Sequence, residues 1–219
     1  MTRTIGNGRR LAAAAAALGW FALIVQLPLT LNLALANGKS LIGGLVAYFS
    51  YFTILTNILV ALTLTVPLVH PRSRAAEFFS LPSVGTGVAT SIAVVGIAYS
   101  LLLRHIWDPQ GMQLFADTLL HDVMPVAFLL YWWFAVPAGR LPWTEALIWT
   151  LYPLLYFVLV LLRGALSGQY PYPFIHAGEF GYHRVLLNAT GILLSFLAIG
   201  LLLTAVGRWK QRPAPARPS

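Results

Sequence analysis

The feature that most constrains this chain is a succession of apolar blocks, each near or beyond the length needed to cross a bilayer. Hydrophobic residues make up 58% of the 219 residues and charged residues only 9%. A hydrocarbon core of roughly 30 Å requires about 20 apolar residues in a helix, and a backbone in lipid must satisfy its own hydrogen bonds. We therefore expect six transmembrane helices, at residues 11–35, 41–69, 84–103, 113–136, 143–162 and 185–206.

These blocks predict an all-α, polytopic membrane protein. Residues 1–207 would form one six-helix transmembrane bundle, and residues 208–219 a basic, proline-rich tail. The start of the chain also has features of a signal peptide, because Arg3, Arg9 and Arg10 precede an alanine-rich run. The first apolar block continues to Leu35, beyond an ordinary signal-peptide core, so a retained first helix is favoured.

The positions of Lys and Arg predict the orientation of the bundle. Four lie in the loops on one side, at Lys39, Arg104, Arg163 and Arg184. Ten lie on the side of the two termini, at Arg3, Arg9, Arg10, Arg72, Arg74, Arg140, Arg208, Lys210, Arg212 and Arg217. Cytoplasmic loops carry the excess of basic residues, so both termini are expected in the cytoplasm. The net charge of +8 suits contact with anionic lipid headgroups, and no motif for nucleic-acid binding accompanies it.

Polar residues inside two of the blocks raise the question of function. In "YFSYFTILTNILVALTLTVPLV", Thr53, Thr56 and Asn57 are spaced i, i+3, i+4 and so share one helix face. In the fourth block, Asp117 precedes His121 by four residues and shares its face. Helical rise places Thr53 and His121 at similar depths, about 18 Å and about 14 Å from the predicted outer end. They are expected to face the bundle interior within reach of each other.

More titratable and aromatic residues gather near the predicted outer end. The candidates there are His105, Asp108, Tyr172, Pro173, Phe174, His176, Glu179 and His183. Imidazoles and carboxylates are suitable zinc ligands, and a zinc-dependent hydrolase is one alternative. Their spacing matches no metal motif, so we predict no metal and no other cofactor. The chain has no cysteine, which excludes thiolate chemistry and disulfides.

Two further interpretations stay open at this stage. Membrane threonines commonly bond their own helix backbone, and asparagines commonly join helices. A six-helix bundle with inward polar residues can also serve as a small transporter, a channel or an assembly factor. The inner halves of the blocks, such as "AFLLYWWFAV", are nearly all apolar, which favours a one-sided pocket over a continuous pathway.

Three segments resemble a known family of membrane enzymes. "YFTILTN", "LLHDVMP" and "YPYPFIHAGEFGYHRVLLNATGILLSF" are similar, in that order, to the signature segments of the androgen-induced and androgen-dependent membrane threonine hydrolases. The chain is also similar over nearly its whole length to bacterial six-helix membrane proteins that look like a prokaryotic branch of that group. The resemblance implies a bacterial cytoplasmic membrane protein.

The resemblance also implies an activity and two catalytic residues. Animal members of the family hydrolyse fatty acid esters of hydroxy fatty acids with an intramembrane threonine and a histidine, which map here to Thr53 and His121. A threonine hydroxyl becomes a nucleophile when a neighbouring imidazole takes its proton. We expect Asp117 to orient His121, and Asn57 and Thr56 to donate hydrogen bonds to the oxyanion. The predicted partners are membrane lipids and a lipid ester; the oligomeric state is left open.

Overall fold

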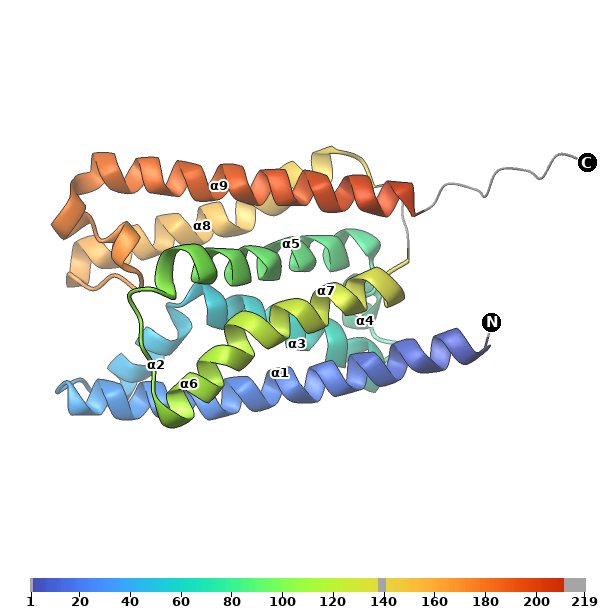
Figure 1. The fold of residues 1–219 in the computed structure, drawn as a ribbon, viewed down its shortest axis with the longest axis horizontal. Coiled ribbons are helices and arrows are strands. Elements are labelled where there is room, and N and C mark those ends of the chain that lie inside the picture. The colour runs from blue at the N-terminus through green and yellow to red at the C-terminus, as the bar shows by residue number, and fades with distance from the viewer. Residues whose placement is uncertain (1, 138–140, 211–219) are drawn as a thin grey trace, which may run out of the picture.

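The fold is known from a computed structural model that describes residues 2–137 and 141–210. Every regular element in these ranges is helical, and the longer helices run along one common axis (Figure 1). The α-helices are α1 (Thr2–Ala36), α2 (Leu41–Phe49), α3 (Phe52–Val69), α4 (Arg74–Phe79), α5 (Pro82–Ala98), α6 (Gly111–Thr118), α7 (Met124–Ala135), α8 (Thr144–Ser167) and α9 (Ala177–Trp209).

Six helical segments in the described residues are long and apolar enough to cross a membrane, which confirms the predicted fold class. They are Gly8–Ala36, Phe52–Val69, Pro82–Leu103, Gly111–Ala135, Thr144–Ser167 and Ala177–Trp209. The chain is therefore an integral membrane protein in architecture. The side of the membrane on which the termini lie stays a prediction. Arg140 and most of the predicted basic tail, residues 211–219, lie outside the described residues.

The predicted second span, residues 41–69, is wrong as one helix. The chain forms the short helix α2, turns at Ser50, has extended backbone at Tyr51, and begins α3 at Phe52. Tertiary contacts hold this break, because the hydroxyl of Tyr156 on α8 donates to the carbonyl of Ser50 at 2.8 Å. The fifth span is also longer than predicted, since α8 continues to Ser167. Helix α9 begins at Ala177 but is kinked at Gly181, where the backbone is not helical (φ 70°, ψ 156°), so the part after the kink starts close to the predicted residue 185.

Two of the spans contain a π-helical turn at the same end of the bundle. One follows α5 over Tyr99–Leu103, and the other joins α6 to α7 over Leu119–Val123. The second has a local cause. Pro125 has no N–H and its ring would clash with the carbonyl of His121 in a regular α-helix, so the N–H of Met124 donates to Leu119 instead. The wider turn changes the direction in which His121 points.

The helix α5 is the central element of the bundle. Its residues from Val84 to Val95 are all buried, and it contacts α3, α7, α8 and α9. Close approach depends on small residues, as membrane helix packing commonly does. A Cβ atom on Gly87 would lie 2.0 Å from the indole of Trp149, so this indole packs directly on the α5 backbone.

The two ends of the bundle differ in content. Helix α1 begins and helix α9 ends at one end, which we call the terminal end (Figure 1). At the other end lie α2, the two π-helical turns and the connection between α8 and α9. We call it the site end, because Thr53, His121 and Tyr172 are located there. In the predicted orientation it is the outer end.

Candidate functional site

Thr53 lies at the start of α3, immediately after the break between helices α2 and α3, on a buried helix face. The exposed fraction is 7% for Thr53 and 0% for both Thr56 and Asn57. The Oγ1 atom of Thr53 is 3.2 Å from Nε2 of His121. The break at Ser50 and Tyr51 thus gives Thr53 a position at a helix N-terminus with its hydroxyl directed toward the fourth span.

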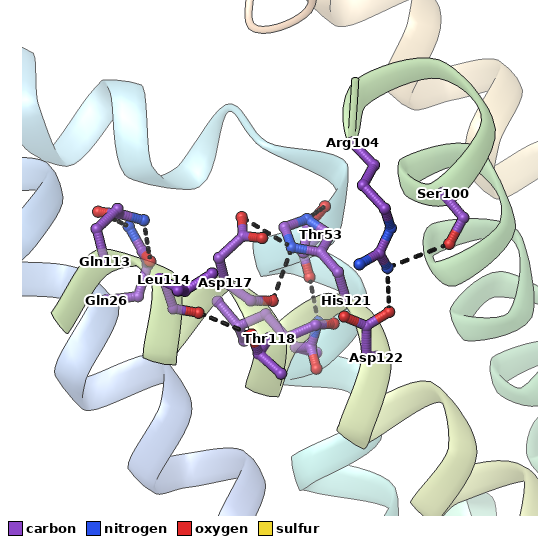
Figure 2. A network of polar contacts seen from close by, with 12 residues as sticks. Gln26, Thr53, Ser100, Arg104, Gln113, Leu114, Asp117, Thr118, His121 and Asp122 are labelled. Atoms are coloured by element: carbon purple, nitrogen blue, oxygen red, sulfur yellow. Dashed lines mark hydrogen bonds and ion pairs between the residues drawn. The ribbon is translucent and has the colours of Figure 1, made fainter. Parts of the chain in front are cut away.

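His121 is held in one orientation by contacts on its other ring nitrogen and on its ring face. Its Nδ1 atom is 3.0 Å from the carbonyl oxygen of Asp117 and 3.2 Å from the Asp117 carboxylate. Tyr99 stacks on the imidazole with ring centroids 4.1 Å apart. Figure 2 shows the imidazole between Thr53 and Asp117. A proton on Nδ1 satisfies both acceptors of Asp117 and leaves Nε2 as an acceptor for the Thr53 hydroxyl.

Asp122 makes a separate pair at the edge of the site. It bonds Arg104, whose guanidinium also lies 4.8 Å above the ring of Tyr99. Asp117 is buried and contacts His121, whereas Asp122 is half-exposed and points to Arg104 (Figure 2). The two neighbouring carboxylates therefore have different partners, as their positions on the helix predict.

Asn57 and Thr56 are not placed as donors to an oxyanion. The Nδ2 atom of Asn57 donates to the carbonyls of Thr53, at 2.9 Å, and Leu120, at 3.2 Å. Thr56 bonds the hydroxyl of Tyr152 at 3.2 Å, and neither residue lines the cavities at Thr53. These contacts join the two residues to the bundle and do not favour them as oxyanion donors, and that role stays a prediction.

Tyr172 is the third polar group at Thr53. Its hydroxyl accepts the backbone N–H of Thr53 at 3.3 Å and lies 3.4 Å from the Thr53 hydroxyl oxygen. Tyr172 precedes a short 3₁₀ turn, Pro173–Ile175, in the connection between α8 and α9. The segment "YPYPF" is thus brought to the threonine, although it lies more than a hundred residues further along the chain.

Two cavities meet at the Thr53–His121 contact. Thr53, Tyr99, Leu103, His121 and Tyr172 line both of them. The first, of about 80 Å³, extends among apolar and aromatic side chains of α5, α8 and α9, including Val94, Pro153, Phe157, Ala189 and Leu193. The second, of about 240 Å³, has a more polar wall that includes Gln26, Thr30, Gln113 and Asp117. The site therefore has an apolar side and a polar side.

Most of the other predicted candidates do not converge on this site. His105, Asp108 and His183 are exposed, and Asp108 bonds Gln110. His176 contacts Glu179 at 3.7 Å and packs on the ring of Tyr170. Phe174 lines the apolar cavity and Pro173 the polar one. Among the described residues, no three histidine or carboxylate side chains come close enough to hold a metal ion, so the zinc alternative has no ligand set there.

Sequence reasoning missed three contributors to the site. Tyr99 stacks on His121, while Gln26 and Gln113 join α1 to α6 through paired amide hydrogen bonds of 3.0 and 3.5 Å (Figure 2). Polar residues inside apolar blocks were a signal that could have identified the two glutamines. Nothing in the sequence distinguishes Tyr99 from the aromatic residues that merely face lipid.

Comparison of the chain with known protein families, with curated proteins and with solved structures finds no match.

Proposed function

We propose that this integral membrane protein hydrolyses lipid esters with Thr53 as the nucleophile and His121 as the general base. The supporting observation is the order of contacts from the Thr53 hydroxyl to Nε2 of His121 and from Nδ1 to Asp117. A nucleophile, a base and a group that orients the base form the arrangement on which hydroxyl nucleophiles depend. The Thr53–His121 contact lies at the junction of two cavities, which provide room for an ester.

The first half of the reaction acylates Thr53. The Thr53 oxygen attacks the ester carbon while its proton moves to Nε2 of His121, and the carbonyl electron pair moves onto the carbonyl oxygen. Collapse of this tetrahedral intermediate breaks the bond to the alcohol oxygen, which takes the proton from His121. The alcohol leaves, and the acyl group stays on Thr53.

The second half restores the enzyme with water. Nε2 of His121 takes a proton from a water molecule as the water oxygen attacks the acyl carbon. When the second intermediate collapses, the Thr53 oxygen leaves and recovers its proton from His121. The products are one alcohol and one fatty acid, so atoms and charges balance without a cofactor. Asp117 acts through His121, because it holds Nδ1 protonated and stabilises the imidazolium.

The two cavities suggest how the substrate lies. A fatty acyl chain suits the apolar cavity between α5, α8 and α9, and the alcohol part suits the cavity lined by Gln26, Thr30 and Gln113. Water has access on the polar side after the alcohol leaves. The resemblance to the membrane threonine hydrolases supports the same substrate class, fatty acid esters, and a bacterial cytoplasmic membrane as the location.

A non-enzymatic pathway through the bundle is less well supported. Toward the terminal end, the interior is filled by buried apolar side chains that include Val60, Leu64, Val88, Ile92 and Phe128. These residues come from α3, α5 and α7. The polar contacts of Thr53 therefore lie only on the site-end side of this apolar core. A transporter or channel would need polar groups to continue beyond them.

A fluorophosphonate probe on membranes containing the protein tests this proposal. The probe reacts with an activated hydroxyl, so wild-type protein is expected to be labelled and Thr53→Ala protein is not. Thr90→Ala is the matched control, because Thr90 is a buried threonine that bonds its own helix. Equal labelling of Thr53→Ala and wild type would contradict the assignment of the nucleophile.

A further inference from the structure

The N–H group of Thr53 has no acceptor inside its own helix. The first N–H groups of a helix lack an acceptor one turn earlier, and Thr53 is the second residue of α3. No side chain caps this helix from its N-cap residue, Tyr51. The hydroxyl of Tyr172 accepts the Thr53 N–H at 3.3 Å instead, so a phenol from a distant connection lies over the start of the nucleophile's helix.

The ring of Tyr172 is held by two aromatic neighbours and by its own backbone. It stacks on Phe174, with centroids 5.2 Å apart and planes 7° apart, and meets Tyr51 edge-on. Proline residues flank it on both sides, which restricts the local backbone. Asn188 of α9 donates to the carbonyl of Phe174 at 2.8 Å. The hydroxyl position is therefore set by packing.

The proposed reaction needs a donor for the negative oxygen of the tetrahedral intermediate. Asn57 and Thr56 bond other groups. The oxyanion forms on the carbon that bonds Oγ1 of Thr53, and useful donors lie about 3 Å from it. The Tyr172 hydroxyl is 3.4 Å from Oγ1 and lines both cavities, so it borders the space where this oxygen must form.

We propose that Tyr172 is a catalytic residue whose hydroxyl donates a hydrogen bond to the oxyanion of both tetrahedral intermediates. This inference rests on the proposed hydrolase function. The Thr53 N–H donates to the phenol oxygen, which polarises the phenol and strengthens its O–H as a donor. When the ester binds, its carbonyl oxygen replaces Oγ1 of Thr53 as the acceptor.

The protonation state of Tyr172 agrees with this role. Burial raises the pKa of the Tyr172 phenol above its ordinary value, which is about 10. The phenol is then protonated at neutral pH and has a hydrogen to donate. An ionised phenolate at this position would repel the oxyanion.

Tyr172→Phe and Tyr48→Phe form a matched pair for testing the role. Each removes one hydroxyl that bonds the backbone of another segment, since Tyr48 donates to the carbonyl of Leu23 at 2.8 Å. Tyr48 lines neither cavity, and the contacts of Thr53 are with His121 and Tyr172. The assay uses purified protein in nanodiscs, a 4-methylumbelliferyl fatty acid ester as substrate, and a long-chain trifluoromethyl ketone, which forms a tetrahedral adduct with a nucleophilic hydroxyl.

Tyr172→Phe is expected to lower kcat by about 10²- to 10³-fold and to change KM less than about threefold. The affinity for the trifluoromethyl ketone is expected to fall by a factor comparable to that of kcat. Tyr48→Phe is expected to keep kcat and ketone affinity near wild type. Wild-type kcat in Tyr172→Phe, or an equal loss in both variants, would overturn the assignment to Tyr172. Thr53→Val is assayed in parallel. Full activity there would overturn the hydrolase mechanism itself, whereas an inactive Thr53→Val beside an active Tyr172→Phe removes the role of Tyr172 alone.

Discussion

The beginning of α3 and the whole of α5 both bury hydroxyl side chains, yet they use them differently. On α5, Thr86, Thr90 and Ser91 each donate to the carbonyl four residues earlier, at 2.8 to 2.9 Å. At the start of α3, Thr53 contacts His121 and Tyr172. These three α5 hydroxyls donate within their own helix, while the Thr53 hydroxyl meets groups from two other parts of the chain.

The break at Ser50 and Tyr51 explains this difference. A threonine inside a helix has an acceptor one turn earlier, and Thr63, further along α3, donates to Leu59 at 2.7 Å in this way. The residue four positions before Thr53 is Phe49, which ends α2. Since the helix does not continue across the break, the Thr53 hydroxyl contacts the imidazole of His121 instead of a carbonyl one turn earlier. A buried threonine is thus available for chemistry where its helix begins.

The largest expected effect separates these two kinds of threonine. Thr53→Val removes the hydroxyl with little change of shape and should lower ester hydrolysis by about 10³-fold or more, because no nucleophile remains. Thr90→Val should keep activity within about threefold, since its hydroxyl bonds only its own helix. Hydrolysis of a fluorogenic fatty acid ester by the two purified variants measures this. Equal activities would mean that position in the helix does not decide function.

His121 should behave as one unit with Thr53. His121→Ala is expected to cost nearly as much activity as Thr53→Ala, and the double variant little more, because each change alone disables the same step. Additive losses in kcat would show that the two residues act independently. A thermal melt of all three proteins verifies that they remain folded.

A smaller loss is expected from the group that orients His121. Asp117→Asn should lower kcat by about 10²-fold, since the carboxylate contact with Nδ1 is lost while the Asp117 carbonyl still holds the ring. Asp122→Asn is the matched control, because this neighbouring carboxylate pairs with Arg104. Comparison of kcat in the two variants tests whether the buried carboxylate has a role that the half-exposed one lacks; the same small change in both would contradict it.

The lengths of the apolar blocks predict the six spans. Residue spacing predicts the inward face of α3 and the shared face of Asp117 and His121, because a shared face depends on helix periodicity. The break in α2–α3 is not predictable in this way. The segment "YFSYF" contains neither Gly nor Pro, and the break is held by Tyr156 and Tyr172 from distant segments. Pro125 does predict an irregular turn. Residue spacing does not predict that this turn leaves the Leu120 carbonyl free to accept the amide of Asn57.

The smallest effect on activity is expected for substitution of Asn57. This residue extends the comparison from hydroxyl side chains to an amide that links two helices. In the π-helical turn the N–H of Met124 donates to Leu119 and Pro125 has none, so the Leu120 carbonyl accepts the amide of Asn57. Asn57→Leu leaves that buried carbonyl without its donor, which should lower the free energy of unfolding by about 1–3 kcal/mol.

Activity in Asn57→Leu should fall only about tenfold, because α3 and the turn that carries His121 then lose one contact while Thr53 and His121 keep theirs. Ser91→Ala on α5 removes a bond within one helix and should change stability by less than about 1 kcal/mol. Unfolding in increasing dodecyl sulfate, followed by tryptophan fluorescence, measures both variants. If Asn57→Leu were as stable as Ser91→Ala but inactive, Asn57 would act in the reaction, and its assignment as a link between two helices would be wrong.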